Sequence, residues 1–163
     1  SSAIRLYKIT RQGFESYKTI LEFIVANYSN TVEGKEAEIL LDEVIPLLKN
    51  SKFEQIEGGE NFKLIYSFTK ENEKEIETFK GQLNLVVKDL KNIELTSSTD
   101  IYDNSITFVV LHGLKSFDGA KGLNVILEKN KNIINDSSFV ISSKNYQILQ
   151  IHKNLSLYLK NNL

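Results

Sequence analysis

The sequence predicts an α+β fold, and two patterns of apolar residues indicate it. Over residues 14–48, apolar residues recur at the three- and four-residue spacing of amphipathic helices. From residue 62 onward, segments in which apolar and polar residues alternate, as in half-buried strands, take turns with further helical segments. A polar stretch ending in "EGGE" separates the two regions. We therefore expect a helical segment over residues 1–50, a linker over 51–61 and an α+β domain with a C-terminal helical extension over 62–163.

Two helices are expected in the N-terminal region, where they would form an antiparallel hairpin joined by "SNTVEGK". The apolar positions of the first are Phe14, Tyr17, Ile20, Leu21, Ile24, Val25 and Tyr28, and those of the second are Ala37, Leu40, Leu41, Val44, Leu47 and Leu48. Pro46 lacks an N–H and its ring clashes with the preceding turn. We therefore expect Pro46 to kink or weaken the second helix near its end.

The second region has the order βαββαβ. Its expected strands are "NFKLIYSF", "IELTSSTDIY", "SITFVVLHG" and "FVIS". The apolar faces of its two helices are Ile76, Phe79, Leu83, Val86 and Leu90 in the first, and Phe117, Ala120, Leu123 and Leu127 in the second. The two halves also resemble each other in sequence. A duplicated unit of this kind predicts a ferredoxin-like plait, a four-stranded antiparallel sheet with both helices on one face.

Helix starts in this region have recognisable signals. Asn72 and Glu75 have the spacing of a capping box, and Ser116 can cap the second helix. After "FVIS", residues 146–153 fit either a short strand or a helical turn. Asn154 could then cap a final helix that runs to Leu163.

Composition excludes several classes of protein. The 163 residues suit one domain, or one domain with a small appendage. Twenty basic against 21 acidic residues give a net charge of −1, which disfavours a nucleic-acid partner. The absence of cysteine excludes disulfides, thiolate catalysis and cysteine-bound metals. No apolar run approaches the roughly 20 residues of a membrane helix, so we expect no direct membrane insertion of this chain.

The glycines of "GLKSFDGAKG" are the first candidate for chemistry, because free N–H groups at a helix start can hold an anion. However, Gly113 and Gly119 are one residue too far apart for a phosphate-binding P-loop, and Lys121 is followed by Gly122 where that motif has Ser or Thr. We interpret the segment as an ordinary strand-to-helix turn.

The two histidines are the next candidates. His112 ends a predicted strand with Asp100, Asp103 and Asp118 nearby in sequence, yet no metal-ligand or triad spacing accompanies it. We expect His112 to be a structural residue whose ring is hydrogen-bonded locally, and the same holds for His152. Asp100 and Asp103 could mimic an acid/base pair, but Asx turns explain them more simply. We therefore expect no catalytic residue, cofactor or metal site.

Aromatic residues on the predicted central strands raise the alternative of an RNA-recognition motif, which stacks bases on such rings. The residues are Tyr66, Phe68 and Phe108. The strand lacks the basic Gly-aromatic-Gly signature of that motif, and the net charge gives no electrostatic attraction to RNA. We rank RNA binding below the other hypotheses and name the three rings as a possible protein interface.

Several segments are similar to a known family. "NYSNTVEGKEAEILLDEVIPLL" resembles the end of a tetratricopeptide array, with Tyr28, Asn30, Thr31 and Ala37 matching and Ser29 in place of the usual Pro. The segments "KLIYSF", "DIYDNSITFVVLHGLKS" and "FVISSKNYQILQIHKNLSLYL" resemble the C-terminal region of the SprE/PorW lipoprotein family, gliding-motility and type IX secretion proteins of Bacteroidota. The resemblance covers most of residues 14–163.

This resemblance implies a tetratricopeptide-like hairpin over residues 1–50 and a location on the periplasmic side of the outer membrane. The implied role is a non-catalytic scaffold that links the translocon to other envelope proteins of the secretion machine. The family's signal peptide and lipidated cysteine do not occur in this sequence, as expected of an excised C-terminal domain. The alternative that we keep open is a small-molecule sensor or enzyme domain, with a ligand near "GLKSFDG" or "SSTDIYDN".

Overall fold

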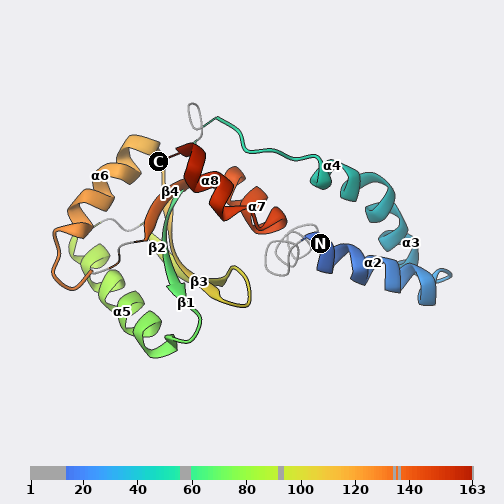
Figure 1. Cartoon of the computed structure of the whole chain (residues 1–163), viewed down its shortest axis with the longest axis horizontal. Helices are drawn as coiled ribbons and strands as arrows, with labels where there is room; N and C mark the ends of the chain where they lie inside the picture. The colour runs from blue at the N-terminus through green and yellow to red at the C-terminus, as the bar shows by residue number, and fades with distance from the viewer. Residues whose placement is uncertain (1–13, 56–59, 92–93, 134, 136, 163) are drawn as a thin grey trace. The chain divides into compact units, whose positions relative to one another are not determined.

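The computed structural model describes residues 14–55, 60–91, 94–133, 135 and 137–162 (Figure 1). Contacts divide the chain into two compact units, each described here by itself. One unit is Glu54–Tyr146, and the other combines Ser1–Phe53 with Gln147–Leu163. This division differs from the predicted one, which placed the last 17 residues with the α+β domain (163 − 146 = 17).

The α+β unit contains a four-stranded antiparallel sheet. Its strands are β1 (Phe62–Thr69), β2 (Thr96–Ile101), β3 (Ile106–Leu114) and β4 (Ser138–Ser142). They are arranged in the order β2-β3-β1-β4, with every neighbouring pair antiparallel. The predicted α+β class and the four-stranded antiparallel sheet are therefore confirmed. The arrangement is compatible with the predicted ferredoxin-like plait.

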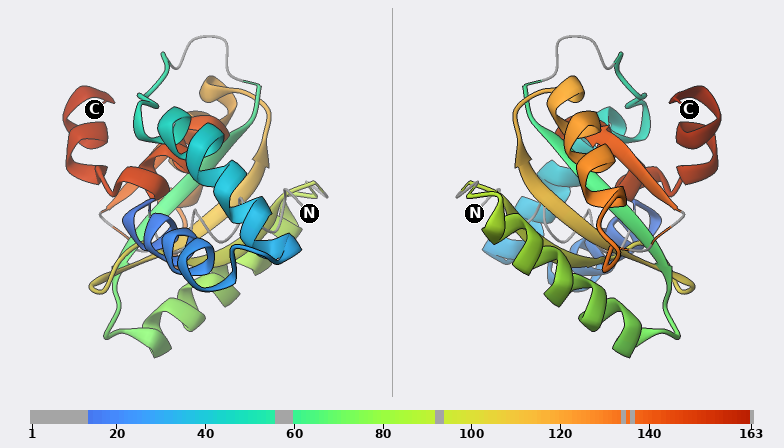
Figure 2. Two further views of the ribbon diagram at one scale, coloured as in Figure 1. Left: turned by 90° about the vertical axis from the view of Figure 1, so that its right-hand side faces the viewer. Right: turned by 90° about the vertical axis from the view of Figure 1, so that its left-hand side faces the viewer.

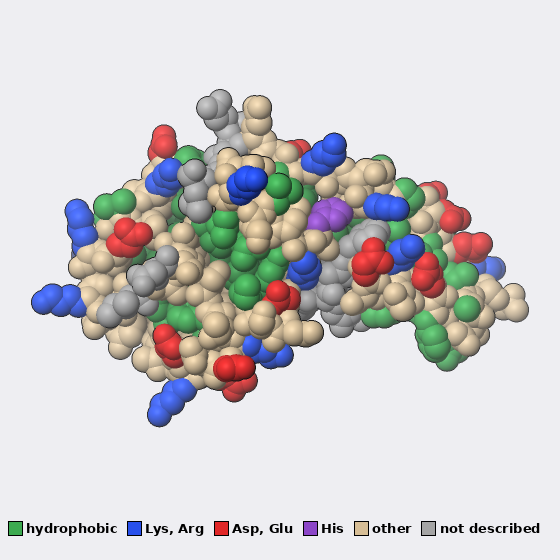
Figure 3. Space-filling model, viewed as in Figure 1, with side chains coloured by type: hydrophobic (Ala, Val, Ile, Leu, Met, Phe, Trp, Pro, Cys, Tyr) green, Lys and Arg blue, Asp and Glu red, His purple; other side chains and the backbone are tan. Residues whose placement is uncertain are grey.

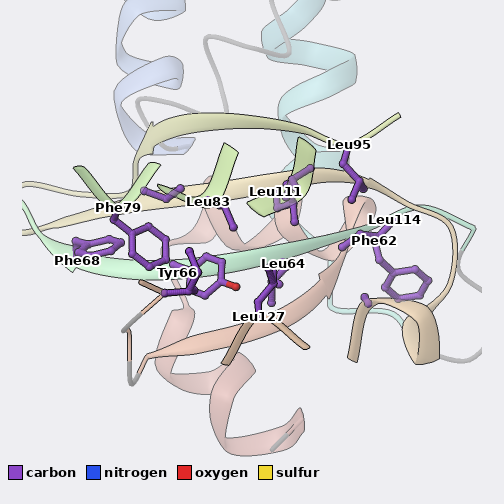
Figure 4. Close-up of a cluster of buried hydrophobic side chains, with 14 of the residues drawn as sticks. Phe62, Leu64, Tyr66, Phe68, Phe79, Leu83, Leu95, Leu111, Leu114 and Leu127 are labelled. Atoms are coloured by element: carbon purple, nitrogen blue, oxygen red, sulfur yellow. The ribbon is translucent and has the colours of Figure 1, made fainter. Parts of the chain in front are cut away.

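Helices α5 (Glu73–Asp89) and α6 (Phe117–Glu128) cover one face of this sheet, as the right-hand view of Figure 2 shows. The core between them contains Leu64, Tyr66 and Phe68 of β1, Val109 and Leu111 of β3, Ile76, Phe79, Leu83 and Val87 of α5, and Ala120 and Leu127 of α6. Figure 4 shows side chains of this cluster meeting in one layer. Most of these positions are the apolar ones of the predicted patterns, so burial of alternating and three-to-four-spaced residues builds this unit. The prediction is wrong at the end of α5, where Val87 is buried, Val86 is only partly buried and Leu90 is exposed.

Of the two caps predicted for α5 and α6, one is correct and one is wrong. Ser116 caps α6, because its Oγ accepts a hydrogen bond from the Gly119 N–H at 3.0 Å. Asn72 precedes α5 but makes no capping hydrogen bond with its side chain. Its amide instead donates to Thr69 Oγ1 at 3.1 Å, so the side chain is engaged with the preceding turn.

The other unit is helical. Its N-terminal helices are α2 (Phe14–Tyr28), α3 (Val32–Ile39), the π-helix η1 (Leu40–Val44) and α4 (Ile45–Lys49). They share a core of Tyr17, Leu21, Ala37 and Ile45 with Ile151 from the C-terminal part of the chain. Thr31 caps α3 by accepting from the Gly34 N–H at 3.0 Å. Gly34 has no room for a side chain, because a Cβ there would lie 1.9 Å from the Tyr28 carbonyl oxygen.

Pro46 interrupts the second helix earlier than predicted. The backbone widens into η1 before the proline, and the Ile45 N–H bonds to the Leu40 carbonyl, five residues back. Pro46 then lies in the first turn of α4, where its missing N–H costs nothing. The proline therefore divides the predicted helix into three consecutive segments.

The C-terminal part of the chain is helical, which decides the open choice for residues 146–153. Helix α7 spans Ser143–His152 and α8 spans Leu155–Asn162. The predicted cap at Asn154 is wrong, because its buried side-chain Oδ1 has no hydrogen-bond partner among the described residues. Lys153 adopts a positive φ of 53°, and this left-handed residue separates the two helices.

Candidate functional site

The sheet face opposite α5 and α6 carries a polar network within the α+β unit. Its members are Lys63 of β1, Ser98 and Asp100 of β2, His112 of β3 and Tyr146 of α7. Lys63 Nζ lies 2.8 Å from His112 Nδ1, and Ser98 Oγ lies 2.6 Å from His112 Nε2. Asp100 accepts from Ser98 Oγ at 2.9 Å and from the Tyr146 hydroxyl at 2.6 Å. The network thus joins three strands and a helix.

A β-bulge places His112 in this network. Phe62 pairs with Leu114 and Leu64 pairs with Leu111, so His112 and Gly113 together face the single residue Lys63. Gly113 has φ 97°, a left-handed conformation that side chains disfavour. A Cβ at this position would also lie 2.5 Å from the Glu94 carbonyl oxygen. Glycine is therefore required here, and the bulge it permits directs the His112 ring toward Lys63.

The hydrogen bonds of the network run in one direction. The Lys63 ammonium can only donate, so His112 Nδ1 is an acceptor and the neutral ring carries its proton on Nε2. Nε2–H then donates to Ser98, whose hydroxyl donates to Asp100. Burial and the Lys63 charge lower the pKa of His112, while Asp100 acts in the opposite direction. The pKa of Lys63 is lowered by burial, partly offset by the charge of Asp100.

This direction determines what the network can do chemically. A serine nucleophile needs a histidine nitrogen that accepts its proton, with a carboxylate on the other ring nitrogen. Here the nitrogen beside Ser98 already carries a proton, and the other nitrogen faces a cation. The arrangement links Lys63 to Asp100 through two neutral groups, which suits a structural polar network and does not suit nucleophilic catalysis.

Sequence reasoning assigned part of this network incorrectly. Asp103 does form the predicted Asx turn, because its Oδ1 accepts from the N–H groups of Ser105 and Ile106, both at 2.8 Å. Asp100 does not, since it accepts from Ser98 and Tyr146. The His112 ring is hydrogen-bonded as expected, but its partners come from two neighbouring strands and not from its own segment. The alternation of β1 and β2 could have placed Lys63, Ser98 and Asp100 on one face, whereas nothing in the sequence indicates Tyr146.

The three predicted interface rings are buried and do not lie on one face. Tyr66 is 1% exposed and Phe68 is 8% exposed, and both contact Phe79 of α5 in the helix-covered core. Phe108 is 0% exposed on the opposite face, where its ring lies near Tyr102, Phe139 and Tyr146. A partner would have to displace packed elements to reach any of the three rings.

The glycine segment and His152 take structural roles in the described chain. Gly113 forms the bulge, and the Gly119 N–H that could have met an anion bonds to Ser116. His152 Nε2 lies 2.9 Å from the Leu48 carbonyl oxygen and 3.0 Å from Ser51 Oγ. These contacts attach the end of α7 to the end of α4, within the helical unit.

Of the twelve large hydrophobic side chains that are exposed in the described part of the chain, six lie on the N-terminal helices. These six are Ile20, Phe23 and Tyr28 on α2, Val32 and Ile39 on α3, and Leu47 on α4. The rings of Phe23 and Tyr28 meet edge to face with centroids 6.5 Å apart. Sequence reasoning had assigned Ile20, Tyr28 and Leu47 to the apolar helix faces.

Two open cavities flank α5 in the α+β unit. One, of about 600 Å³, lies beside Phe68, Asn72, Phe79 and Asn132. The other, of about 680 Å³, lies between α5 and β2, with Ile76, Thr99, Ile101 and Thr107 among its lining residues and Lys70, Glu73, Lys74 and Glu77 at its polar positions. The second cavity borders the segment "SSTDIYDN", where the small-molecule alternative expects a ligand.

In the described part of the chain, no three or more His, Asp or Glu side chains lie together so as to hold a metal ion. No helix in these residues has the length and apolar character needed to cross a bilayer.

Comparison with known proteins gave no match. No protein-family model, no curated protein and no solved structure is similar to this chain at a significant level.

Proposed function

We propose that this protein is a non-catalytic protein-interaction module. The observation that carries the proposal is the set of exposed hydrophobic side chains on the N-terminal helices, where Phe23 and Tyr28 also contact each other, because exposed apolar patches mark protein-binding sites. The inward-facing residues of the same helices already form a core. The outward-facing ones thus add nothing to that core and are available to a partner.

The partner class rests on the family resemblance of the sequence. We propose that the module belongs to a type IX secretion and gliding-motility machine and links its translocon to other envelope proteins on the periplasmic side of the outer membrane. In this proposal α2 and the α3–η1–α4 segment are a tetratricopeptide-like hairpin, and the α+β unit is a ferredoxin-like plait. The strand order β2-β3-β1-β4 and the placement of α5 and α6 support the second assignment.

The experiment is co-purification from envelope extracts of a gliding bacterium, with the whole chain as bait. We expect secretion-system subunits to be recovered by the native chain and lost with the double variant Ile20→Ser, Phe23→Ser. The matched control is Leu85→Ser, which removes an exposed leucine from α5 in the other unit. Recovery of no envelope protein, or equal recovery by both variants, would contradict the proposal.

The second candidate function is binding of a small molecule, favoured by the cavity between α5 and β2. Thermal-shift measurements with nucleotides, amino acids and divalent metal ions test it. A ligand that raises the melting temperature of the native chain, and not of a Thr99→Lys variant that fills the cavity, would favour this function. Unchanged melting temperatures across the panel would count against it.

A further inference from the structure

We propose that the outward face of α3, η1 and α4 binds an amphipathic helix whose apolar stripe is flanked by basic residues. This inference rests on the proposed function and names the chemistry of the partner. The face is a single row, here called the outer stripe: Val32, Glu36, Ile39, Glu43 and Leu47. Its three hydrophobic residues are exposed: Val32 by 71%, Ile39 by 54% and Leu47 by 73%.

The outer stripe is separate from the face that packs on α2. The inward face carries Ala37 and Ile45, which are buried, and Leu41 and Leu48, which are partly buried against the same cluster. From Val32 to Glu43 the stripe has the four-, three-, four-residue spacing of one α-helix face, and Leu47 follows four residues later, after η1. Its hydrophobic residues, Val32, Ile39 and Leu47, are therefore not needed to hold the helices together.

The π-helix η1 aligns the two ends of the stripe. On a continuous α-helix, Leu47 would be rotated by about 80° from Ile39 around the helix axis, because eight residues advance about 800°. The wider turn of η1 accommodates one additional residue, so every residue after it is rotated back around the helix axis by roughly 100°. Leu47 then lies about 20° from Ile39 around that axis, on the same side of the helix as Val32. The irregular turn thus makes a continuous stripe, in keeping with the frequent use of π-turns at functional sites.

The net charge of these helices indicates which charge the partner should carry. Glu33, Glu36, Glu38, Asp42 and Glu43 lie on α3 and η1, against Lys35 on α3 and Lys49 on α4. The segment 32–49 therefore has a net charge of −3 (2 − 5 = −3). Figure 3 shows acidic side chains, with some basic ones among them, over the part of the surface formed by these helices, next to exposed hydrophobic ones. A partner with Lys or Arg beside its apolar residues would meet this field favourably.

The spacing selects a helix over an extended peptide. At a rise of 1.5 Å per residue, Val32 to Ile39 and Ile39 to Leu47 are separated by roughly 10–12 Å along the axis. This is two helical turns, the repeat at which a partner helix presents residues i and i+7. An extended strand presents same-side residues about every 6.7 Å and does not match this repeat.

The test uses two synthetic helical peptides of 18 residues with identical leucine stripes, one flanked by lysine and one flanked by glutamate. Binding to the native chain is measured by fluorescence anisotropy at low and at physiological salt. We expect the lysine peptide to bind at least tenfold more tightly, and this preference to shrink as salt rises. Equal binding of the two peptides, or no binding of the lysine peptide, would overturn the inference.

Variants locate the binding to the outer stripe. The double variant Ile39→Ser, Leu47→Ser should bind the lysine peptide at least tenfold more weakly than the native chain. The matched control, Val125→Ser with Ile126→Ser on α6, should bind it with unchanged affinity. Asp42→Lys with Glu43→Lys should reverse the preference toward the glutamate peptide. Since all changed residues are exposed, circular dichroism and melting temperature should match the native chain. The proposal needs both effects. It would be contradicted if the lysine variant reversed the preference while the serine variant bound normally, or if the serine variant lost binding while the lysine variant kept the native preference.

Two outcomes separate this inference from the proposed function. If envelope partners co-purify through α2 but neither peptide binds, the function stands and the helix-binding stripe is wrong. If the lysine peptide binds through the stripe but no envelope protein is recovered, the stripe stands and the assignment to a secretion machine is wrong. Sedimentation could also show that the native chain forms a dimer and that the double variant Ile39→Ser, Leu47→Ser is a monomer. A second copy of the chain would then occupy the outer stripe, and the inference would be overturned.

Discussion

The Tyr146 hydroxyl donates a 2.6 Å hydrogen bond to Asp100 Oδ2, and this contact attaches the start of α7 to β2 within the α+β unit. Hydrogen bonds to a charged group contribute about 1.5–3 kcal/mol when buried. Since Asp100 is only half-buried, we expect Tyr146→Phe to lower the free energy of unfolding by about 1–2 kcal/mol. Urea denaturation of the native chain and the variant measures the difference, and an unchanged midpoint would refute this role of the contact.

Tyr66 serves as the control for Tyr146, because we do not expect Tyr66→Phe to lower the free energy of unfolding. Its hydroxyl is buried with no hydrogen-bond partner among the described residues, and burial raises its pKa far above the ordinary value for tyrosine. A buried polar group without a partner costs about 1–3 kcal/mol. Tyr66→Phe should therefore leave the free energy of unfolding unchanged or raise it by about 1 kcal/mol. Destabilisation by the same urea assay would show that the hydroxyl has a partner.

Because of His112, we expect the folded protein to lose stability on mild acidification. Its pKa is lowered in the folded chain, first by burial and then by Lys63, so the unfolded chain binds its proton more readily. The groups that face the ring are Lys63 from β1 and Ser98 and Asp100 from β2. The stability contributed by neutral His112 is complete above about pH 6.5 and declines as the pH falls from there toward the folded pKa.

The measurement is the free energy of unfolding of the native chain and of His112→Gln between pH 7.5 and pH 5. Glutamine keeps a polar side chain at this position but does not titrate. We expect the native curve to fall more steeply than that of the variant across this range. Parallel curves would show that His112 does not contribute to the acid sensitivity of the fold.

Gly113 and Gly122 form a matched pair of substitutions in the α+β unit. Gly113→Ala requires a left-handed conformation and a contact 2.5 Å from the Glu94 carbonyl oxygen, so we expect a loss of at least about 1–3 kcal/mol. Gly122 lies in α6 and has nothing within 4 Å of its would-be Cβ. Gly122→Ala should therefore stabilise the fold by about 0.5–1 kcal/mol.

The melting temperatures of the two variants should move in opposite directions. In Gly113→Ala, the His112 ring should also lose its contact with Lys63, which NMR of the histidine side chain would detect. A Gly113→Ala chain as stable as the native one would contradict the required bulge. The same result for both glycines would show that the β3 backbone adapts to a side chain.

The sequence predicted the strands well because burial in this unit follows simple alternation. Leu64, Tyr66 and Phe68 face α5 and α6 while Lys63 faces away, as their spacing indicates. The predicted helix that opens after Asn72 corresponds to α5 for the same reason, since Ile76, Phe79 and Leu83 recur on the side that packs. Local patterns therefore sufficed wherever a residue's environment is set by its own strand or helix.

The rest depended on contacts between distant residues. Asp100 was assigned to a turn because its partner Tyr146 lies 46 positions away, and no local pattern joins the two. Residues 146–153 remained undecided because their apolar residues fit two periods. The π-turn before Pro46 follows from how the backbone adjusts to a proline within a packed helix, which the sequence indicates only as a kink.

Strand β2 lies at one edge of the sheet and is almost wholly polar, so hydrophobic alternation cannot fix its alignment. Its two sides nevertheless differ in their partners: Ser97 donates to Asn84 of α5 at 2.6 Å, while Ser98 and Asp100 join the network around His112. A slip of one residue would turn Asp100 toward α5 and leave Lys63 without its acidic counterpart. Within the strand, the alignment is therefore specified by polar partners, and the buried residues Leu95 and Tyr102 hold it at either end.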